Sequence, residues 1–180
     1  MLTNSLNLDE SFVAKDFNLK SVDGKYYNIN QIRGNNGTLI FFICNHCPYV
    51  KAIAKKLERD TSELRSYGVN SVGIMSNDFH AYPEDSYDNM KIFSDNNNFS
   101  FPYLLDATQE VAKIYNAVCT PDFFGFDRDL QLKYRGRLDD SGLQLNKNTN
   151  RELFLSMKSI SEGKKTIYNN PSVGCSIKWK

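Results

Sequence analysis

The chain has 180 residues, a formal net charge of +1 and 41% hydrophobic residues. This length is enough for one domain with a buried core, so we expect a single domain over residues 1–180. Acidic and basic residues nearly balance and are interspersed, which argues against a basic field for nucleic acid or an anionic membrane. We expect neither class as a partner, and we expect a monomer or a weak dimer.

The N-terminal segment lacks the cationic start and the apolar core of a signal peptide, and no run approaches the ~20 apolar residues of a membrane span. Four cysteines are too few for a secreted disulfide scaffold of this length. These features predict a cytoplasmic protein.

The first third of the chain predicts a hairpin followed by a central strand. Two extended segments within residues 12–32 flank Asp23-Gly24, a dipeptide typical of hairpin turns. The β-branched and aromatic run from Thr38 to Ile43 predicts a buried strand. Apolar residues then recur at helical spacing from Val50 onward. A strand therefore leads into a helix, with a C-x-x-C sequence between them.

The two cysteines of this sequence, Cys44 and Cys47, lie where the first turn of the helix is expected. Unpaired N–H groups and the positive end of the helix dipole favour a thiolate there. We expect Cys44 to be the ionised sulfur and Cys47 to lie one turn inside the helix, with Pro48 in the first turn. Together with a protonated His46, such surroundings lower a cysteine pKa from about 8.5 to roughly 3.5–7.5. The pattern predicts a redox-active thiol pair.

Two other interpretations of the pair stay open. A zinc site needs two further ligands from Cys119, Cys175 and His80, none of which forms a second C-x-x-C or H-x-x-H pair. The alternative is a pair of inert, buried thiols. A disulfide between Cys44 and Cys47 closes a loop of only a few residues and stabilises a fold little, which favours a reactive role.

The rest of the chain predicts a mixed sheet with helices on both faces. The strand expected at 69–75 is parallel to the first, because a helix connects them. Later elements are a helix at 83–96, an extended segment at 99–105, a helix at 109–116, a hairpin of 123–126 and 131–134, and a helix at 151–162. Residues 164–180 form a C-terminal tail without strong periodicity.

Several segments resemble a known family. A C-x-x-C pair after a buried strand, with Thr120-Pro121 far downstream, resembles the thioredoxin fold. The N-terminal hairpin and the segment around Pro83 resemble its peroxiredoxin-like branch, the AhpC/TSA or redoxin group. A more specific resemblance is to the thioredoxin-family proteins called peroxiredoxin-like 1, through FICNHCPYVKA, SNDFHAYPEDS, FPYLLDATQEVAKIYNAVCTPDFFGFD, YRGRLDDS and PSVGCSIKWK.

This resemblance implies a thiol-disulfide oxidoreductase with antioxidant activity and no cofactor or bound metal. It assigns the attack on a substrate disulfide to Cys44 and the resolution of the mixed disulfide to Cys47. The partners it implies are thiol or disulfide substrates, protein or small molecule, and an upstream thiol reductant. His46 lies directly before the second Cys, and a His at this position resembles the strongly oxidising periplasmic branch of the superfamily. We therefore expect a reduction potential above that of thioredoxin. Thr120 and Pro121 match the loop that binds an extended substrate, with a cis peptide bond.

Two positions depart from the related families. Thioredoxin has a buried acid where this chain has Thr38, so proton transfer at Cys47 needs another group or water. If Cys47 is placed on the peroxidatic position of a peroxiredoxin, Ile40 and Cys44 replace the expected Pro and Thr. This difference argues against peroxidase catalysis.

Two alternative functions stay open beside the oxidoreductase. One is a thiol-dependent peroxidase that uses Cys47, and the other is a metal-binding or delivery module at the C-x-x-C pair with His46. Cys119 and Cys175 are candidates for accessory thiols. His80 is expected in a loop. Surface ion pairs are expected between the arginines Arg135 and Arg137 and the carboxylates Asp139 and Asp140.

Overall fold

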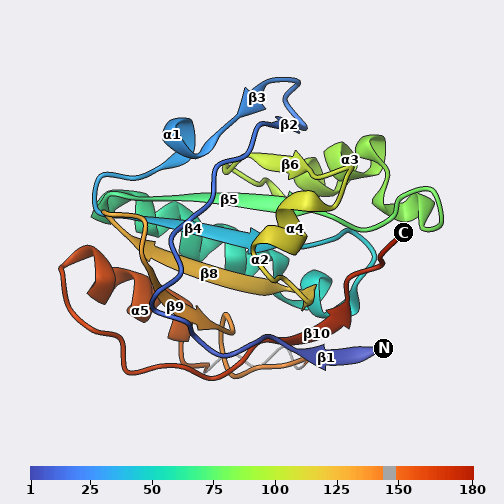
Figure 1. Ribbon diagram of the computed structural model, residues 1–180. Coiled ribbons are helices and arrows are strands. Elements are labelled where there is room, and N and C mark those ends of the chain that lie inside the picture. Colours follow the sequence, from blue (N-terminus) through green and yellow to red (C-terminus); the bar gives the residue numbers. More distant parts are fainter. Residues whose placement is uncertain (144–148) are drawn as a thin grey trace.

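The computed structural model describes residues 1–143 and 149–180. Its core is a seven-stranded mixed sheet in the order β3-β2-β6-β5-β4-β8-β9, accompanied by a three-stranded sheet in the order β1-β10-β7 (Figure 1). The strands are β1 (Leu2–Asn4), β2 (Leu19–Ser21), β3 (Tyr26–Tyr27), β4 (Gly37–Phe42), β5 (Val69–Met75), β6 (Tyr103–Leu105), β7 (Cys119–Thr120), β8 (Asp122–Asp127), β9 (Leu132–Gly136) and β10 (Val173–Ser176). The helices are α1 (Ile29–Ile32), α2 (Pro48–Leu64), η1 (Arg65–Tyr67), η2 (Pro83–Asp85), α3 (Tyr87–Asn97), α4 (Glu110–Ile114) and α5 (Glu152–Ser161).

The centre of the large sheet is the pair of β4 and β5. The two strands are parallel, with Gly37 opposite Val69 and Phe42 opposite Ile74. All six residues of β4 are buried, as its β-branched and aromatic composition predicts. β8 pairs antiparallel with β4 on the other side and forms a hairpin with the edge strand β9. The predicted parallel unit and the predicted hairpin are both confirmed.

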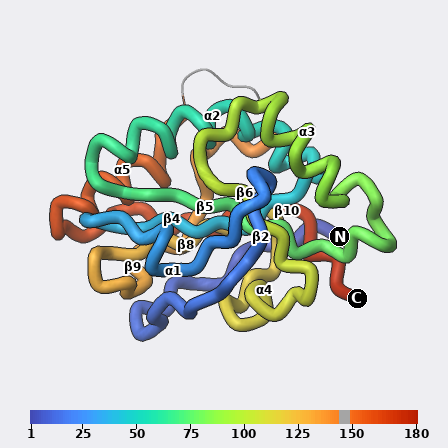
Figure 2. The backbone as a smooth tube through the Cα atoms, turned by 90° about the horizontal axis from the view of Figure 1, so that it is seen from above, coloured from blue at the N-terminus to red at the C-terminus, as the bar shows by residue number. Residues whose placement is uncertain are grey.

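Both faces of this sheet are covered. Alternate residues of a strand point to opposite faces. Leu39 and Phe41 belong to the core that includes residues of α2, α3 and α5, whereas Ile40 and Phe42 belong to the core with α1 and α4. Figure 2 shows α2, α3 and α5 on one side of the sheet and α1 and α4 on the other. The predicted layered α/β architecture is confirmed.

α2 is the helix that follows the C-x-x-C pair. Its inward residues include Val50 and Leu57, both fully buried, while Lys51 and Lys55 are exposed. The amphipathic spacing expected from the sequence explains this orientation. Within the part of the chain that the structure describes, none of the helices combines the length and the apolar character that crossing a membrane requires.

The short elements are the ones that the sequence did not indicate. β1, β7 and β10 have two to four residues each, too few for an alternating pattern to emerge. The helix expected at 83–96 is divided at Ser86, whose side chain accepts from the Asn89 amide as the N-cap of α3. The segment at 164–180, expected to be a tail, contains β10, which pairs with both β1 and β7.

Candidate active site

The C-x-x-C pair lies in the segment between β4 and α2. α2 begins at Pro48, and Cys47 is its N-cap residue with an extended backbone (φ −63°, ψ 123°). A proline disfavours the helical conformation of the residue before it, so the helix does not include Cys47. The expectation that Cys47 lies one turn inside the helix is therefore wrong. Cys47 caps the helix, and Cys44 precedes it in the loop.

Both sulfur atoms contact Thr120. Cys44 Sγ lies 3.3 Å from Thr120 Oγ1, and Cys47 Sγ donates a hydrogen bond to the Thr120 carbonyl at 3.2 Å. The peptide bond between Thr120 and Pro121 is cis, as predicted. Both cysteine side chains are 0% exposed. The loop before β8 therefore closes over the thiol pair.

A buried carboxylate holds the histidine of the C-x-x-C sequence. His46 Nδ1 donates to Asp85 Oδ2 at 2.7 Å, and the same oxygen accepts from Asn77 Nδ2 at 2.8 Å. The Asn45 amide donates to Asp85 Oδ1 at 2.8 Å. The His46 ring also stacks on Tyr82, with centroids 5.6 Å apart and planes 8° apart. Orientation of the imidazole is thus set by η2 and the residue before it.

Asp85 is the functional residue that sequence reasoning missed. In the sequence, Pro83-Glu84-Asp85 indicates only the start of a helix. A buried acid comparable to that of thioredoxin was sought at Thr38, whose hydroxyl instead accepts from the Gly34 amide. Asp85 lies 39 residues from His46 along the chain, so no local pattern connects them.

The two sulfurs carry unequal charge. A hydrogen bond from the Cys44 thiol lowers the pKa of Cys47; burial opposes this, and the backbone amides of Cys175 and Val50 lower it further. The same hydrogen bond raises the pKa of Cys44, and burial and the negative charge of Asp85 raise it more. In the dithiol form, Cys47 is therefore the ionised sulfur and Cys44 keeps its proton.

This result reverses the expectation that Cys44 is the ionised thiol. The unpaired N–H groups of a helix point at its N-cap, and here the N-cap is Cys47. Cys44 lies outside that field and beside a carboxylate. Ionisation of Cys47 gives up the hydrogen bond to the Thr120 carbonyl, because a thiolate cannot donate. The donors that remain, led by the Cys44 thiol, outweigh that loss.

His46 and Asp85 form an ion pair at the rim of the site. The hydrogen bond that His46 donates to Asp85 raises the pKa of His46 above its ordinary value, against the effect of burial. Burial by itself would raise the pKa of Asp85, but hydrogen bonds from His46 and Asn77 lower it. The His46 side chain is 24% exposed, whereas that of Asp85 is 0% exposed. His46 therefore links the buried Asp85 carboxylate to the solvent-exposed rim of the site.

The donor group at the site differs from the zinc set that the sequence left open. Among the described residues, the one group of three donors is Cys44, His46 and Asp85, whose ligand atoms lie within 4.8 Å of one another. The His46 and Asp85 atoms already hydrogen-bond each other. His80 is exposed in a turn, and Cys119 is not part of the group. The group can therefore offer a metal ion three ligand atoms, of which the imidazole and the carboxylate already bond each other.

The two accessory thiols differ in their surroundings. Cys119 is buried and donates to the Pro121 carbonyl at 3.4 Å, and burial raises its pKa strongly. A neutral, buried thiol of this kind is inert. Cys175 is partly exposed and lies on β10 directly opposite Thr120. It is packed against the same core cluster as Cys44 and Cys47.

The arginine pairs expected at the surface are wrong. Arg135 is buried and bonds Asp122 at 3.0 Å, and its guanidinium lies over the Phe124 ring. Arg137 bonds Glu152 at 2.7 Å. Burial raises the pKa of Asp122 to about 6, against the attraction of Arg135. Both arginines therefore tie the end of the hairpin to the core and do not contact the thiols.

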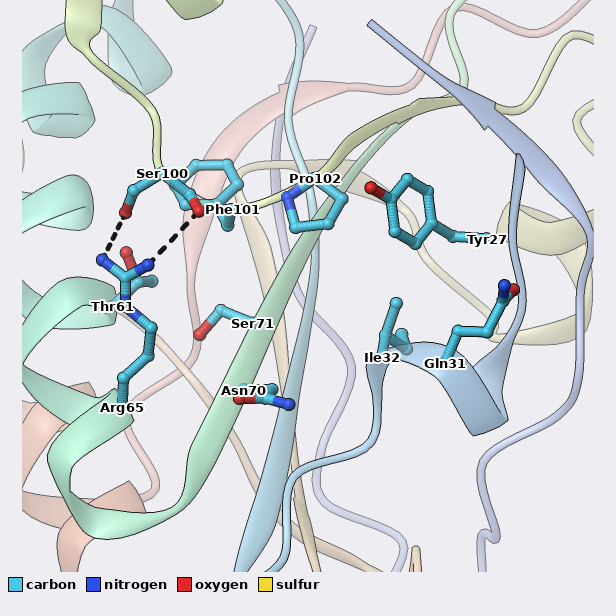
Figure 3. A pocket seen from close by; sticks show the side chains of 10 residues that line it. All are labelled: Tyr27, Gln31, Ile32, Thr61, Arg65, Asn70, Ser71, Ser100, Phe101 and Pro102. Carbon is cyan, nitrogen blue, oxygen red and sulfur yellow. Dashed lines mark hydrogen bonds between the residues drawn. The ribbon is translucent and has the colours of Figure 1, made fainter. Parts of the chain in front are cut away.

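A cavity of about 150 Å³ lies away from the thiol pair (Figure 3). Its lining includes Asn70 and Ser71 at the start of β5, which pair with the start of β4, whereas the cysteines follow the end of β4. Arg65 closes one side through its bond to Ser100 Oγ at 2.8 Å. The cavity contains none of the predicted site residues.

A mixed sheet, a C-x-x-C pair between its central strand and the following helix, and a facing cis-proline loop define the class as a redox protein of the thioredoxin fold. The chain belongs to the AhpC/TSA family, whose model matches residues 12–135. No curated protein sequence matches the chain.

Solved structures agree with this assignment. An uncharacterised conserved protein from Geobacillus kaustophilus is 42% identical and superposes with a TM-score of 0.94 over 100% of this chain and 97% of its own. A hypothetical protein from Sinorhizobium meliloti 1021 is 34% identical, with a TM-score of 0.94 over 99% and 98%. The thioredoxin domain of a thiol-disulfide oxidoreductase from Bacteroides vulgatus shares the fold at 15% identity, with a TM-score of 0.60 over 71% and 88%.

Proposed function

We propose that this protein is a thiol-disulfide oxidoreductase that cycles Cys44 and Cys47 between dithiol and disulfide. The observation that carries the proposal is the shared proton of the two sulfurs, which leaves a thiolate on Cys47 with a protonated partner beside it. Exchange needs such a thiolate and a second thiol within reach. Family membership supports a redox role of this kind.

The reaction follows from this charge distribution. The Cys47 thiolate attacks one sulfur of a substrate disulfide, forms a mixed disulfide and releases the other sulfur as a thiolate, which takes a proton from the His46 imidazolium. Neutral His46 then accepts the proton of Cys44, and Cys44 attacks Cys47 Sγ. This second attack releases the other substrate sulfur as a thiolate, which takes the proton that His46 had accepted, and leaves a Cys44–Cys47 disulfide. Two upstream thiols, or one dithiol, reverse the two steps.

His46 is the natural carrier of this proton. One ring nitrogen of His46 lies within 4.8 Å of Cys44 Sγ, and the hydrogen bond to Asp85 holds the ring in place. An imidazolium beside the pair also stabilises the reduced form, which makes the disulfide a better oxidant. We therefore expect a reduction potential above about −270 mV, the value of thioredoxin. Equilibration with glutathione that gives a lower value would contradict this.

The decisive experiment compares insulin reduction by dithiothreitol with wild type, Cys47→Ser, Cys44→Ser and Cys119→Ser. We expect Cys47→Ser to lose the acceleration completely and Cys44→Ser to stop at the mixed disulfide. Cys119→Ser is the matched control, because it also removes a buried thiol and should keep the activity. Equal rates for wild type and Cys47→Ser would overturn the proposal.

A second candidate is a thiol peroxidase. Its support is the lowered pKa of Cys47, since a thiolate is the form that attacks peroxide. Its weakness is the absence of the expected Pro and Thr at Ile40 and Cys44. Stopped-flow trapping of a sulfenate on Cys47 in the Cys44→Ser variant tests it. Formation at micromolar peroxide supports the peroxidase, and a requirement for millimolar peroxide rejects it.

Substrate contact is expected beside the proline loop. A hollow of about 70 Å³ there is bordered by Pro121 and by Tyr49 and Ile53 of α2. Its apolar and aromatic lining suits a side chain that flanks the substrate cysteine. Tyr49→Ala should raise the KM for a protein disulfide more than it changes kcat, because Tyr49 borders this hollow and is not one of the exchanging thiols.

A further inference from the structure

The C-terminal strand places a third thiol at the active site. β10 pairs antiparallel with β7, and Cys175 is directly opposite Thr120. Residues directly opposite in an antiparallel pair have their side chains on the same face. The Thr120 hydroxyl lies 3.3 Å from Cys44 Sγ, so the Cys175 side chain is directed to the same side as the thiol pair.

The strand is held closely against the proline loop. Gly174 leaves no room for a side chain, because a Cβ there would overlap the Thr120 carbonyl. Ser172 Oγ donates to the Pro121 carbonyl at 2.6 Å, and the Lys178 amide donates to Asn77 Oδ1 at 2.9 Å. β1 pairs with the other edge of β10. Cys175 is thereby fixed beside the site from both sides.

Cys175 packs against the buried cluster that contains Cys47. Thr120, which lies opposite Cys175, accepts the hydrogen bond of the Cys47 thiol, so the two cysteines share this neighbour. The amide and the thiol of Cys175 both lower the pKa of Cys47. Cys44 and Cys47 are fully buried, whereas Cys175 is partly exposed. Because β10 also occupies the backbone edge of Thr120, an external sulfur reaches Cys175 more easily than either buried cysteine.

From these contacts we infer that Cys175 is a third exchanging thiol, which passes the disulfide between the buried Cys44–Cys47 pair and an external thiol. This inference rests on the proposed oxidoreductase function. It adds a catalytic residue and an exit route that the C-x-x-C pair by itself does not provide.

The exchange balances without an added oxidant. The Cys175 thiolate attacks Cys47 Sγ of the Cys44–Cys47 disulfide, a Cys47–Cys175 disulfide forms, and Cys44 leaves and takes up the proton that Cys175 lost. An external thiolate then attacks Cys175 Sγ and releases Cys47 as a thiolate. A second external thiolate removes the first from Cys175 as an external disulfide. Two electrons pass from the two external thiols to the enzyme.

The charge changes favour this order of steps. In the dithiol form, burial, the hydrogen bond to Cys47 and the charge of Cys47 raise the pKa of Cys175. Once Cys47 is part of a disulfide it carries no charge, so it no longer raises the pKa of Cys175. Cys47 is also the better leaving group of the Cys47–Cys175 bond, because the sulfur with the lower pKa leaves faster.

The first test is disulfide mapping in Cys44→Ser. The variant is equilibrated in a glutathione redox buffer, alkylated and analysed by peptide mass spectrometry. We expect a Cys47–Cys175 disulfide in Cys44→Ser and in Cys44→Ser/Cys119→Ser, but none in Cys44→Ser/Cys175→Ser. If Cys47 instead carries glutathione and Cys175 is found alkylated as a free thiol, the inference is overturned.

The second test measures how fast the Cys44–Cys47 disulfide is reduced by a protein thiol, reduced and denatured ribonuclease. Because exchange rates depend on access to the attacked sulfur, we expect Cys175→Ser and Cys175→Ala to be slower by about tenfold. Circular dichroism verifies that both variants are folded, and Cys119→Ser is the control. Rates equal to wild type would reject the exit role. A wild type that forms no Cys44–Cys47 disulfide would instead reject the underlying function, and the two failures are thus distinguished.

Discussion

Two buried carboxylates in this protein, Asp85 and Asp122, each contact one cationic side chain, but their pKa values shift in opposite directions. Each is 0% exposed and each contacts a cation, His46 at 2.7 Å and Arg135 at 3.0 Å. The pKa of Asp85 is lowered, whereas that of Asp122 is raised to about 6. The first lies beside the thiol pair, and the second lies under the hairpin of β8 and β9.

The difference comes from the number of donors. Both oxygens of Asp85 accept hydrogen bonds, from Asn45, His46 and Asn77. Oδ2 of Asp122 accepts from Arg135 and, at 3.3 Å, from the Val118 amide, but Oδ1 has no hydrogen-bond partner among the described residues. Burial disfavours a charge unless hydrogen bonds replace the lost water. A pair contact is therefore not enough to keep a buried carboxylate ionised, and the active site provides the additional donors.

The largest effect should come from removing the cation beside Asp122. Arg135→Met leaves a buried carboxylate without its partner, which costs about 3 to 5 kcal/mol in comparable cases. Urea unfolding near neutral pH measures the change. The double variant Asp122→Leu/Arg135→Met should recover most of it. A single variant as stable as wild type would show that the pair contributes nothing.

Next in size is the effect of Asp85 on the chemistry. Asp85→Asn removes the charge that keeps His46 protonated and oriented, so we expect disulfide exchange to slow by about a hundredfold, within the range of general acid-base catalysis. The His46 pKa, followed by NMR, should fall in the same variant. Asp122→Asn is the control and should leave both quantities unchanged. If the exchange rate of Asp85→Asn matches wild type, His46 does not carry the proton.

The two carboxylates should also give opposite pH dependence of stability. For Asp122, whose pKa is raised, the contribution is complete below about pH 4 and is lost as the pH rises through 6. That loss is on the order of 2 to 3 kcal/mol and should disappear in Asp122→Asn. For Asp85, whose pKa is lowered, the contribution is present above about pH 4 and is lost as the pH falls further.

Chemical unfolding of the two Asn variants and wild type, from about pH 3 to 7, compares these contributions directly. Subtracting each variant from wild type isolates one carboxylate from the other titrating groups. Slopes of the same sign for both residues would contradict the donor-count explanation.

The smallest effect concerns the stacking of Tyr82 on His46. A cation above an aromatic ring gains about 0.5 to 1 kcal/mol at an exposed site, so Tyr82→Leu should lower the His46 pKa by less than one unit. NMR titration of the imidazole measures this. Tyr26→Leu changes an exposed tyrosine of β3 and should have no effect. A larger drop would mean that Tyr82 also positions Asp85.

Long, periodic segments were predictable and short or distant ones were not. The buried run of β4 and the helical spacing of α2 correctly indicated a strand followed by a helix. Strand β10 has four residues and is held by neighbours more than fifty positions away, so its own sequence contains no signal. The prediction that Cys47 lies inside the helix was wrong, although the sequence contained the reason. Pro48 restricts the backbone of the residue before it.

The amino-acid sequence by itself determined that a thiol pair follows a buried strand and precedes an amphipathic helix, because both elements are encoded by side-chain periodicity over neighbouring residues. Only the tertiary structure decided which sulfur is ionised, which acid positions the histidine and which third thiol reaches the pair. These properties depend on contacts between residues far apart in the chain, 39 positions for His46 and Asp85 and 73 for Cys47 and Thr120. Charge in a protein interior is set by the donors that surround each group, and the fold brings those donors together.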